Sequence, residues 1–173
     1  AALVASAGKR VLVIDGDMRR GEVHSHFGVR HQPGLSDVLR GAEPASVIQR
    51  EVLPGLDVLT KGTLPSHPSE LLMSERFRDL LDALSRHYDL VIIDTPPVLA
   101  VTDSTVIGKY AGTSLLVVRY GRHPIAEITE TAKRLETGGV NLQGVLLTDV
   151  PPAVPMLGGS YNGGYYGYES IAE

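Results

Sequence analysis

Short runs of aliphatic residues, most of them ending at a polar position, alternate along the chain with amphipathic segments of helical period. An uninterrupted aliphatic run indicates a strand buried on both faces, as in a parallel sheet. The runs predict strands over 11–15, 56–60, 89–94, 114–120 and 144–149. Because helical segments separate most of these strands, we expect an α/β fold, with a parallel sheet flanked by helices and joined by right-handed crossovers.

The clearest helical pattern runs from about Pro68 to His87, where apolar residues recur every three or four positions. This stripe is expected to face the core and consists of Leu72, Met73, Phe77, Leu80, Leu81 and Leu84. Shorter helices are expected over 1–7, over 35–39 with Ser36 as N-cap, over 44–50, over 103–109 with Asp103 as N-cap, and over 124–137. His24 and His26 fall in a predicted polar loop, where a His-x-His pair is compatible with metal binding and with plain solvation.

Composition narrows the function classes. A length of 173 residues suits one domain, and the absence of cysteine excludes disulfides and zinc–thiolate sites. The net charge of −4 gives no global attraction to nucleic acid or to an anionic membrane, so no nucleic-acid partner is expected. No apolar run approaches the length of a membrane span and no signal peptide is recognisable, which makes the cytoplasm the default location.

Two of the predicted strands end in carboxylates: Asp15 and Asp17 follow the first, and Asp94 ends another. Residues two apart in an extended segment share a face and lie roughly 6.6 Å apart, and open α/β sheets bind ligands at the carboxyl ends of their strands. Grouped acids need a cation or a shared proton, and oxygen ligands favour Mg²⁺. The alternative is that Asp15 and Asp94 only cap turns.

Three kinds of site are compatible with acidic strand ends. A dinucleotide-binding fold requires G-x-G-x-x-G after a strand, and the chain has no such stretch. A phosphoacceptor receiver domain is disfavoured because Asp94 lies about 80 residues after Asp15 and because the basic residues that follow the core of the 114–120 strand are Arg119 and Arg122, not lysine. The third is a deviant P-loop NTPase, in which Asp94 helps to hold Mg²⁺ and the other two acids lie beside the γ-phosphate.

The composition changes at Pro151. Prolines give way to a glycine-rich segment in which four of the seven tyrosines lie within eight residues, namely Tyr161, Tyr165, Tyr166 and Tyr168. We therefore expect a core over 1–150 followed by a flexible tail over 151–173. The tail is either a low-complexity end or a set of phenol hydroxyls offered as substrate.

Several segments resemble those of one family. The run Val11-Leu-Val-Ile-Asp-Gly-Asp-Met-Arg-Arg-Gly21 resembles the Walker A′ motif of bacterial tyrosine kinases, and Leu90-Val-Ile-Ile-Asp-Thr-Pro-Pro97 resembles their Walker B motif. The segment from Pro68 to Phe77 is similar to one found in the Wzc-type branch. The acidic motifs alone also fit septum-placement and plasmid-partition ATPases, whereas the tyrosine cluster points to the kinases.

This resemblance implies an ATP-dependent autokinase that phosphorylates its own tail, often on a neighbouring subunit of a ring, and so controls capsular or exopolysaccharide polymerisation and export. It implies catalytic roles for Asp15 and Asp17, a Mg²⁺ site at Asp94 with Asp15, and phosphorylation at the four tail tyrosines. The implied partners are further copies, a membrane polysaccharide co-polymerase region and a tyrosine phosphatase, on the cytoplasmic side of the inner membrane.

The chain departs from the family pattern at two points. It contains no G-x-x-x-x-G-K-[ST] loop, which the family carries ahead of the helix predicted over 1–7, so we expect a kinase fragment that binds ATP poorly and transfers nothing alone. Thr148-Asp149 stands where relatives often place an asparagine near adenine, and Asp149 either contacts the base or ends the strand. The remaining alternatives to an autokinase are an ATPase switch and a non-catalytic acceptor piece.

Overall fold

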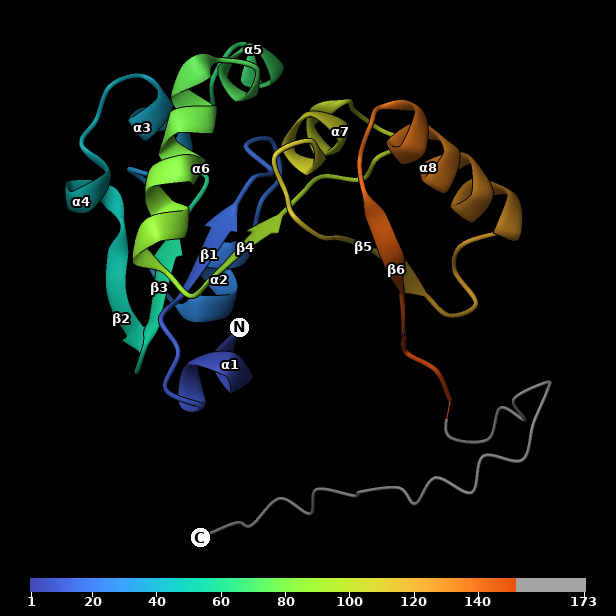
Figure 1. The fold of residues 1–173 in the computed structure, drawn as a ribbon, viewed down its shortest axis with the longest axis horizontal. Coiled ribbons are helices and arrows are strands. Elements are labelled where there is room, and N and C mark those ends of the chain that lie inside the picture. The colour runs from blue at the N-terminus through green and yellow to red at the C-terminus, as the bar shows by residue number, and fades with distance from the viewer. Residues whose placement is uncertain (152–173) are drawn as a thin grey trace, which may run out of the picture.

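The computed structural model describes residues 1–151, so the predicted tail and its four tyrosines lie outside the described residues (Figure 1). A four-stranded sheet has the order β2-β3-β1-β4, with β1 at Val11–Asp15, β2 at Gln49–Leu53, β3 at Leu56–Leu59 and β4 at Leu90–Asp94. β1 pairs in parallel with β3 and β4, and β2 is antiparallel to β3. A second, two-stranded parallel sheet joins β5 (Ser114–Arg119) to β6 (Leu142–Thr148). The α/β class with mainly parallel pairing is confirmed.

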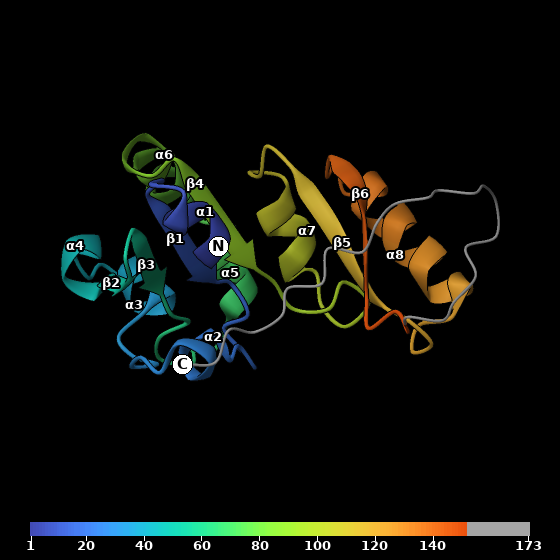
Figure 2. The same ribbon diagram turned by 90° about the horizontal axis from the view of Figure 1, so that it is seen from below.

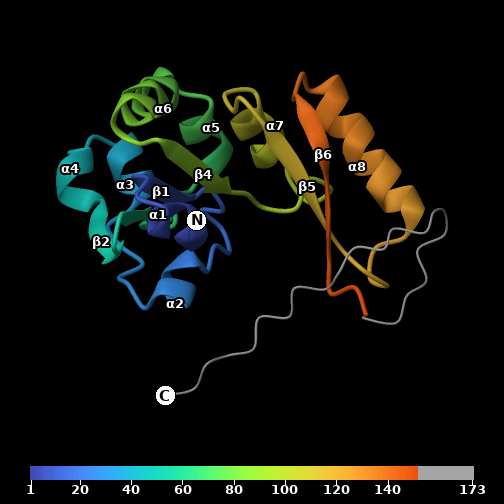
Figure 3. The same cartoon turned by 60° about the horizontal axis from the view of Figure 1, so that its bottom comes forward.

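Helices lie on both faces of the four-stranded sheet. Figure 3 shows α5 and α6 on one face and α2 on the other, while α7 and α8 accompany β5 and β6 (also seen from below in Figure 2). The helices are α1 (Ala2–Ser6), α2 (Val23–Phe27), α3 (Leu35–Leu39), α4 (Pro44–Val47), α5 (Pro68–Leu72), α6 (Glu75–His87), α7 (Asp103–Gly108) and α8 (Ile125–Thr137). Within residues 1–151, no helix is both long and apolar enough to cross a membrane.

Every residue of β1 is buried, and its side chains alternate between two cores as the pleat of a strand requires. Leu12 and Ile14 belong to a cluster that includes the α6 residue Phe77, whereas Val11 and Val13 belong to one that includes residues of α1 and α2. This confirms the predicted double burial of β1. The same prediction of double burial is wrong for β4. Leu90–Ile93 are only partly buried, because among the described residues β4 pairs on one side only.

The helix predicted over 44–50 was wrong in its second half. α4 ends at Val47, Ile48 is already extended, and Gln49 starts β2, a strand that the sequence analysis missed. Pro54 and Gly55 then turn the chain back into β3, and Gly55 has the positive φ of 75° that such a turn requires. Because the hairpin is antiparallel, the sheet is mixed and not wholly parallel.

The single helix predicted over 68–87 is two helices. Ser74 is extended, with its hydroxyl donating to the Leu71 carbonyl at 2.6 Å, and α6 starts after it. A serine side chain that bonds nearby backbone competes with helix continuation, which explains the break. The break leaves Met73 exposed, contrary to its predicted place in the core stripe, while Leu72, Phe77, Leu80 and Leu84 are buried as predicted and Leu81 packs partly buried against them.

Three smaller predictions also failed. His24 and His26 lie on the short helix α2 and not in a polar loop. Ser36 lies inside α3, whose N-cap is Gly34, and its hydroxyl donates to the Thr63 carbonyl at 2.5 Å. Asp103 is the first helical residue of α7, after an N-cap at Thr102, because its carboxyl group is used for contacts to other elements.

Candidate functional site

The predicted acids come together at the carboxyl end of the four-stranded sheet. Asp15 and Asp94 are register partners in the parallel β1–β4 pairing, so they end adjacent strands at the same level. Asp17 follows two residues after β1. Asp15 is buried, Asp17 half-buried and Asp94 exposed. The sheet therefore brings the three carboxylates to one edge, graded from the interior to the surface.

Asp15 is the most buried of the three. One of its carboxylate oxygens accepts the Val23 backbone N–H at 3.2 Å, and the other is buried without a hydrogen-bond partner among the described residues. Burial raises the pKa of Asp15 to about 6, the Val23 N–H opposes this rise, Asp94 adds to it, and the charge of Lys61 opposes it. An oxygen in this state is poised to receive a proton or a cation.

The pKa of Asp94 is also raised, first by desolvation from the surrounding chain and then by the charge of Asp17, while the Thr95 N–H and His26 act in the opposite direction. The Asp17 carboxylate accepts the backbone N–H groups of Arg19 and Arg20 at 3.0 and 2.9 Å. Turn capping is therefore part of what these acids do, but within residues 1–151 it leaves one Asp15 oxygen without a hydrogen-bond partner.

Two glycines are required by the close packing of this edge. A Cβ added at Gly21 would lie 1.9 Å from a carboxylate oxygen of Asp15, and one added at Gly16 would lie 2.7 Å from the Asp94 carbonyl. The Gly16 N–H donates to that same carbonyl at 2.8 Å. The backbone of β4 thus makes the close approach to Gly16, and the sequence analysis did not single out Gly21.

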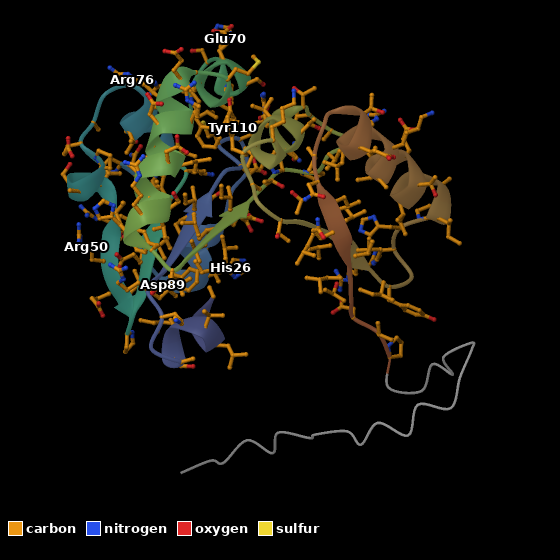
Figure 4. The ribbon with its side chains drawn as sticks, viewed as in Figure 1. His26, Arg50, Glu70, Arg76, Asp89 and Tyr110 are labelled. Carbon is orange, nitrogen blue, oxygen red and sulfur yellow. The ribbon has the colours of Figure 1, made fainter. Side chains whose placement is uncertain are left out.

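A polar network joins the loop after β1 to α5 and α7. Arg19 donates through Nε to the Asp103 carboxylate at 3.2 Å, and the Ser69 hydroxyl donates to the other Asp103 oxygen at 2.5 Å. The sequence analysis missed these contacts, as well as the charges of Lys61 and His26 (His26 is labelled in Figure 4). The Pro68–Phe77 segment was recognised by resemblance only, and the structure shows that its Ser69 reaches Asp103.

The acids at the carboxyl ends of β1 and β4 offer oxygen ligands of the kind that Mg²⁺ prefers. Within residues 1–151, no three histidine, aspartate or glutamate side chains gather into a cluster that could hold a metal ion alone. Mg²⁺ at phosphoryl-transfer sites is bound through one or two carboxylates together with substrate phosphates and water. The unpartnered Asp15 oxygen beside Asp94 fits that pattern of incomplete protein ligation.

Thr148 and Asp149 lie at the carboxyl end of β6, and the side chain of each contacts a residue of β5. The Asp149 carboxylate forms an ion pair with Arg119, and the Thr148 hydroxyl donates to the Val118 carbonyl at 3.4 Å. A cleft of about 680 Å³ lies between the 98–102 loop, α7 and α8, and none of the three acids lines it. The three acids therefore lie outside that cleft, at the carboxyl ends of β1 and β4.

Comparison with known proteins gives a consistent result. The family model described as an AAA domain matches residues 1–137. The chain is 46% identical over 176 residues to a putative tyrosine-protein kinase EpsB of Ralstonia nicotianae, covering 98% of this chain and 23% of that protein. It is 42% identical over 170 residues to the tyrosine-protein kinase Wzc of Salmonella typhimurium, again covering 98% and 23%. The chain thus spans about a quarter of the length of these relatives.

Among solved structures, the kinase domain of the Escherichia coli tyrosine kinase Etk superposes with a TM-score of 0.84 at 45% identity, covering 95% of this chain and 64% of that one. The cell-division protein MinD of Aquifex aeolicus superposes with a TM-score of 0.66 at 19% identity, covering 84% and 58%, which shows a shared fold only. The chain therefore belongs to the AAA domain family, in the branch formed by the kinase domains of bacterial tyrosine kinases.

Proposed function

We propose that this chain is the catalytic part of an ATP-dependent protein-tyrosine autokinase whose phosphate acceptors are its own Tyr161, Tyr165, Tyr166 and Tyr168. The observation that carries the proposal is the state of Asp15, which is fully buried and lies beside Asp94 at the end of the adjacent strand. In the part of the chain that the structure describes, one Asp15 oxygen has no hydrogen-bond partner. The high identity to proteins named tyrosine kinases supports it.

In this proposal Asp15 and Asp17 are the catalytic acidic residues, whose carboxylates accept a proton. A phenol has a pKa of about 10 and needs a base at neutral pH, and a base is most effective when its own pKa lies near the working pH. The raised pKa of Asp15, about 6, suits that task. Asp17 lies two residues away, with one carboxylate oxygen fixed by two backbone N–H groups.

Asp94 with Asp15 would hold Mg²⁺, and bound Mg²⁺ would neutralise the negative charge that develops on the transferred phosphoryl group. Thr148 and Asp149 are the proposed contacts to the nucleotide base. For Asp149 this role requires its ion pair with Arg119 to be shared with or replaced by the ligand.

Residues 1–150 are the proposed nucleotide-binding core and residues 151–173 the acceptor segment, which is presented to a neighbouring copy in a ring. Each phosphate adds about −1.5 to −2 charges, so four add roughly −6 to −8 to a chain whose net charge is −4. Repulsion between the phosphorylated segment and the acidic site is then expected to loosen the ring. Identical sedimentation of the phosphorylated and unphosphorylated protein would contradict this step.

The longer protein to which such a domain belongs is proposed to be anchored on the cytoplasmic side of the inner membrane. There it would act with a polysaccharide co-polymerase region and be reset by a tyrosine phosphatase, regulating capsular or exopolysaccharide polymerisation and export. The support is the motif resemblance to the Wzc-type kinases. Exopolysaccharide yield in cells that carry Asp15→Asn, compared with the parent strain, tests this extension.

Mapping of phosphate tests the function itself. Since the 173 residues contain no G-x-x-x-x-G-K-[ST] loop, the assay uses the chain extended at its N-terminus by a segment carrying such a loop, incubated with ATP and Mg²⁺. Mass spectrometry should find phosphotyrosine between Tyr161 and Tyr168 in the parent and none in Asp15→Asn. ATP hydrolysis with an unmodified tail would instead favour the ATPase switch.

A further inference from the structure

The first turn of α7 contacts the loops that follow both acidic strands. Asp103 and Ser104 are consecutive and buried. Asp103 accepts a hydrogen bond from the side chain of Arg19, and Ser104 donates one to the carbonyl of Pro96. Arg19 lies two residues after Asp17, and Pro96 lies two residues after Asp94. A single helical turn therefore links the two loops that carry the proposed catalytic and Mg²⁺-associated acids.

The contact to Arg19 continues to the catalytic loop through the backbone. The N–H groups of Arg19 and Arg20 both donate to one oxygen of Asp17, at 3.0 and 2.9 Å. The Gly21 N–H then donates to the Asp17 carbonyl at 2.8 Å. Fixing the Arg19 side chain thus fixes the turn that caps Asp17 and places Gly21 against Asp15.

Asp103 is itself held at both oxygens. One accepts from Arg19 and the other from the Ser69 hydroxyl of α5, and the Asp103 side chain is only 1% exposed while that of Arg19 is 41% exposed. Burying a carboxylate is costly, and an apolar side chain of similar volume often stabilises a fold as well as a buried ion pair does. The pair is therefore better explained by the geometry it imposes than by stability.

We propose that Asp103 and Ser104 are positioning residues that set the spacing between the Asp17 loop and the Asp94 loop. Asp103 acts through Arg19, and Ser104 acts through the Pro96 carbonyl. This proposal rests on the proposed kinase function for its consequence, because the spacing matters where the acids must meet one phosphoryl group. Its geometric part does not depend on the kinase function, since it concerns only contacts within residues 15–104.

The geometric part is tested by amide hydrogen exchange on the 173-residue chain. Asp103→Asn should accelerate exchange at Arg19 and Arg20 by about tenfold or more, because the charge-assisted bond that orders their loop is weakened. The matched control is Asp79→Asn, which removes the exposed Arg78–Asp79 ion pair and should leave both amides unchanged.

The catalytic part is tested in the extended chain with ATP and Mg²⁺. Asp103→Asn should lower kcat for tail phosphorylation about 10- to 100-fold while KM for ATP stays within about twofold, because misplaced groups slow chemistry more than binding. Combining Arg19→Gln with Asp103→Asn should lower kcat no further than the more impaired of the two single variants does, since both changes act through one contact. Ser104→Ala provides a second route if Asp103→Asn folds poorly.

Parent-like exchange at Arg19 and Arg20 in Asp103→Asn would overturn the proposal, and so would parent-like kcat in both Asp103→Asn and Ser104→Ala. Exchange that accelerates equally throughout β1 and β4 would also overturn it, since that result describes general destabilisation. If the parent extended chain transfers no phosphate, the kinase proposal fails, while the exchange experiment still decides whether α7 positions the loop.

Discussion

Asp15 is buried with a raised pKa, and its charged form therefore costs the fold stability. Its burial and its proximity to Asp94 keep its pKa at about 6, above the ordinary value of 3.8. The folded chain therefore holds a proton on Asp15 more tightly than the unfolded chain does, so this residue's contribution to stability is greatest below pH 4 and is lost as the pH rises through 6.

Asp15→Asn is predicted to stabilise the fold at pH 8, by about 2 to 3 kcal/mol or roughly 4 to 10 °C in Tm, because it removes a buried charge. The gain should shrink as the pH falls from 6 to 4. Thermal unfolding across this range measures it. The control, Asp89→Asn, has the opposite sign, since the Arg10 N–H lowers the pKa of Asp89 and its contribution is present at neutral pH and lost on acidification. A lower Tm for Asp15→Asn at pH 8 would contradict this view of the site.

Gly21→Ala is predicted to destabilise the chain by about 1 to 3 kcal/mol and to displace the Asp15 carboxylate, because the new Cβ meets that group at 1.9 Å. Gly112→Ala is the matched control, since nothing lies within 4 Å of its Cβ position and its φ is not positive. Urea denaturation of both variants measures the difference. Equal midpoints would show that Asp15 moves aside freely.

Among the elements, β1 and β4 were the most predictable from sequence, since each is an aliphatic run that ends in an acid and the parallel pairing follows from that pattern. The break at Ser74 and the strand β2 were not predicted. Each depends on the backbone conformation of a few residues, which the spacing of apolar positions does not reveal. The hydrogen bonds of Asp103 could not be predicted either, because its partners Ser69 and Arg19 lie 34 and 84 positions away along the chain.

α6 supplies the largest side chain of the core beneath β1. Phe77 is fully buried and makes an edge-on contact with Tyr110, with ring centroids 5.7 Å apart; Figure 4 shows Tyr110 between α6 and α7. Phe77→Ala is predicted to cost about 3 to 5 kcal/mol, whereas Met73→Ala, at an exposed position, should cost less than about 1 kcal/mol. Chemical denaturation compares them, and a similar loss for both would mean that α6 is not anchored through Phe77.

The whole molecule is proposed to consist of a folded core and a C-terminal segment that carries the phosphate acceptors. Deleting residues 152–173 is predicted to leave the Tm of the core within about 2 °C, because the proline- and glycine-rich sequence of that segment has no periodic apolar face to bury. The same deletion should remove every tail acceptor and abolish autophosphorylation in the extended chain. A large fall in Tm would show that the boundary between core and acceptor segment is misplaced.

The central claim is that the acidic edge transfers phosphate to tyrosine and not to water. The most direct measurement follows the γ-phosphate of ATP through the first turnovers of the extended chain and compares the amount on Tyr161, Tyr165, Tyr166 and Tyr168 with the amount released as free phosphate. Phosphotyrosine is predicted to predominate in the parent and to disappear in Asp15→Asn. Release of free phosphate with all four tyrosines unmodified would contradict it.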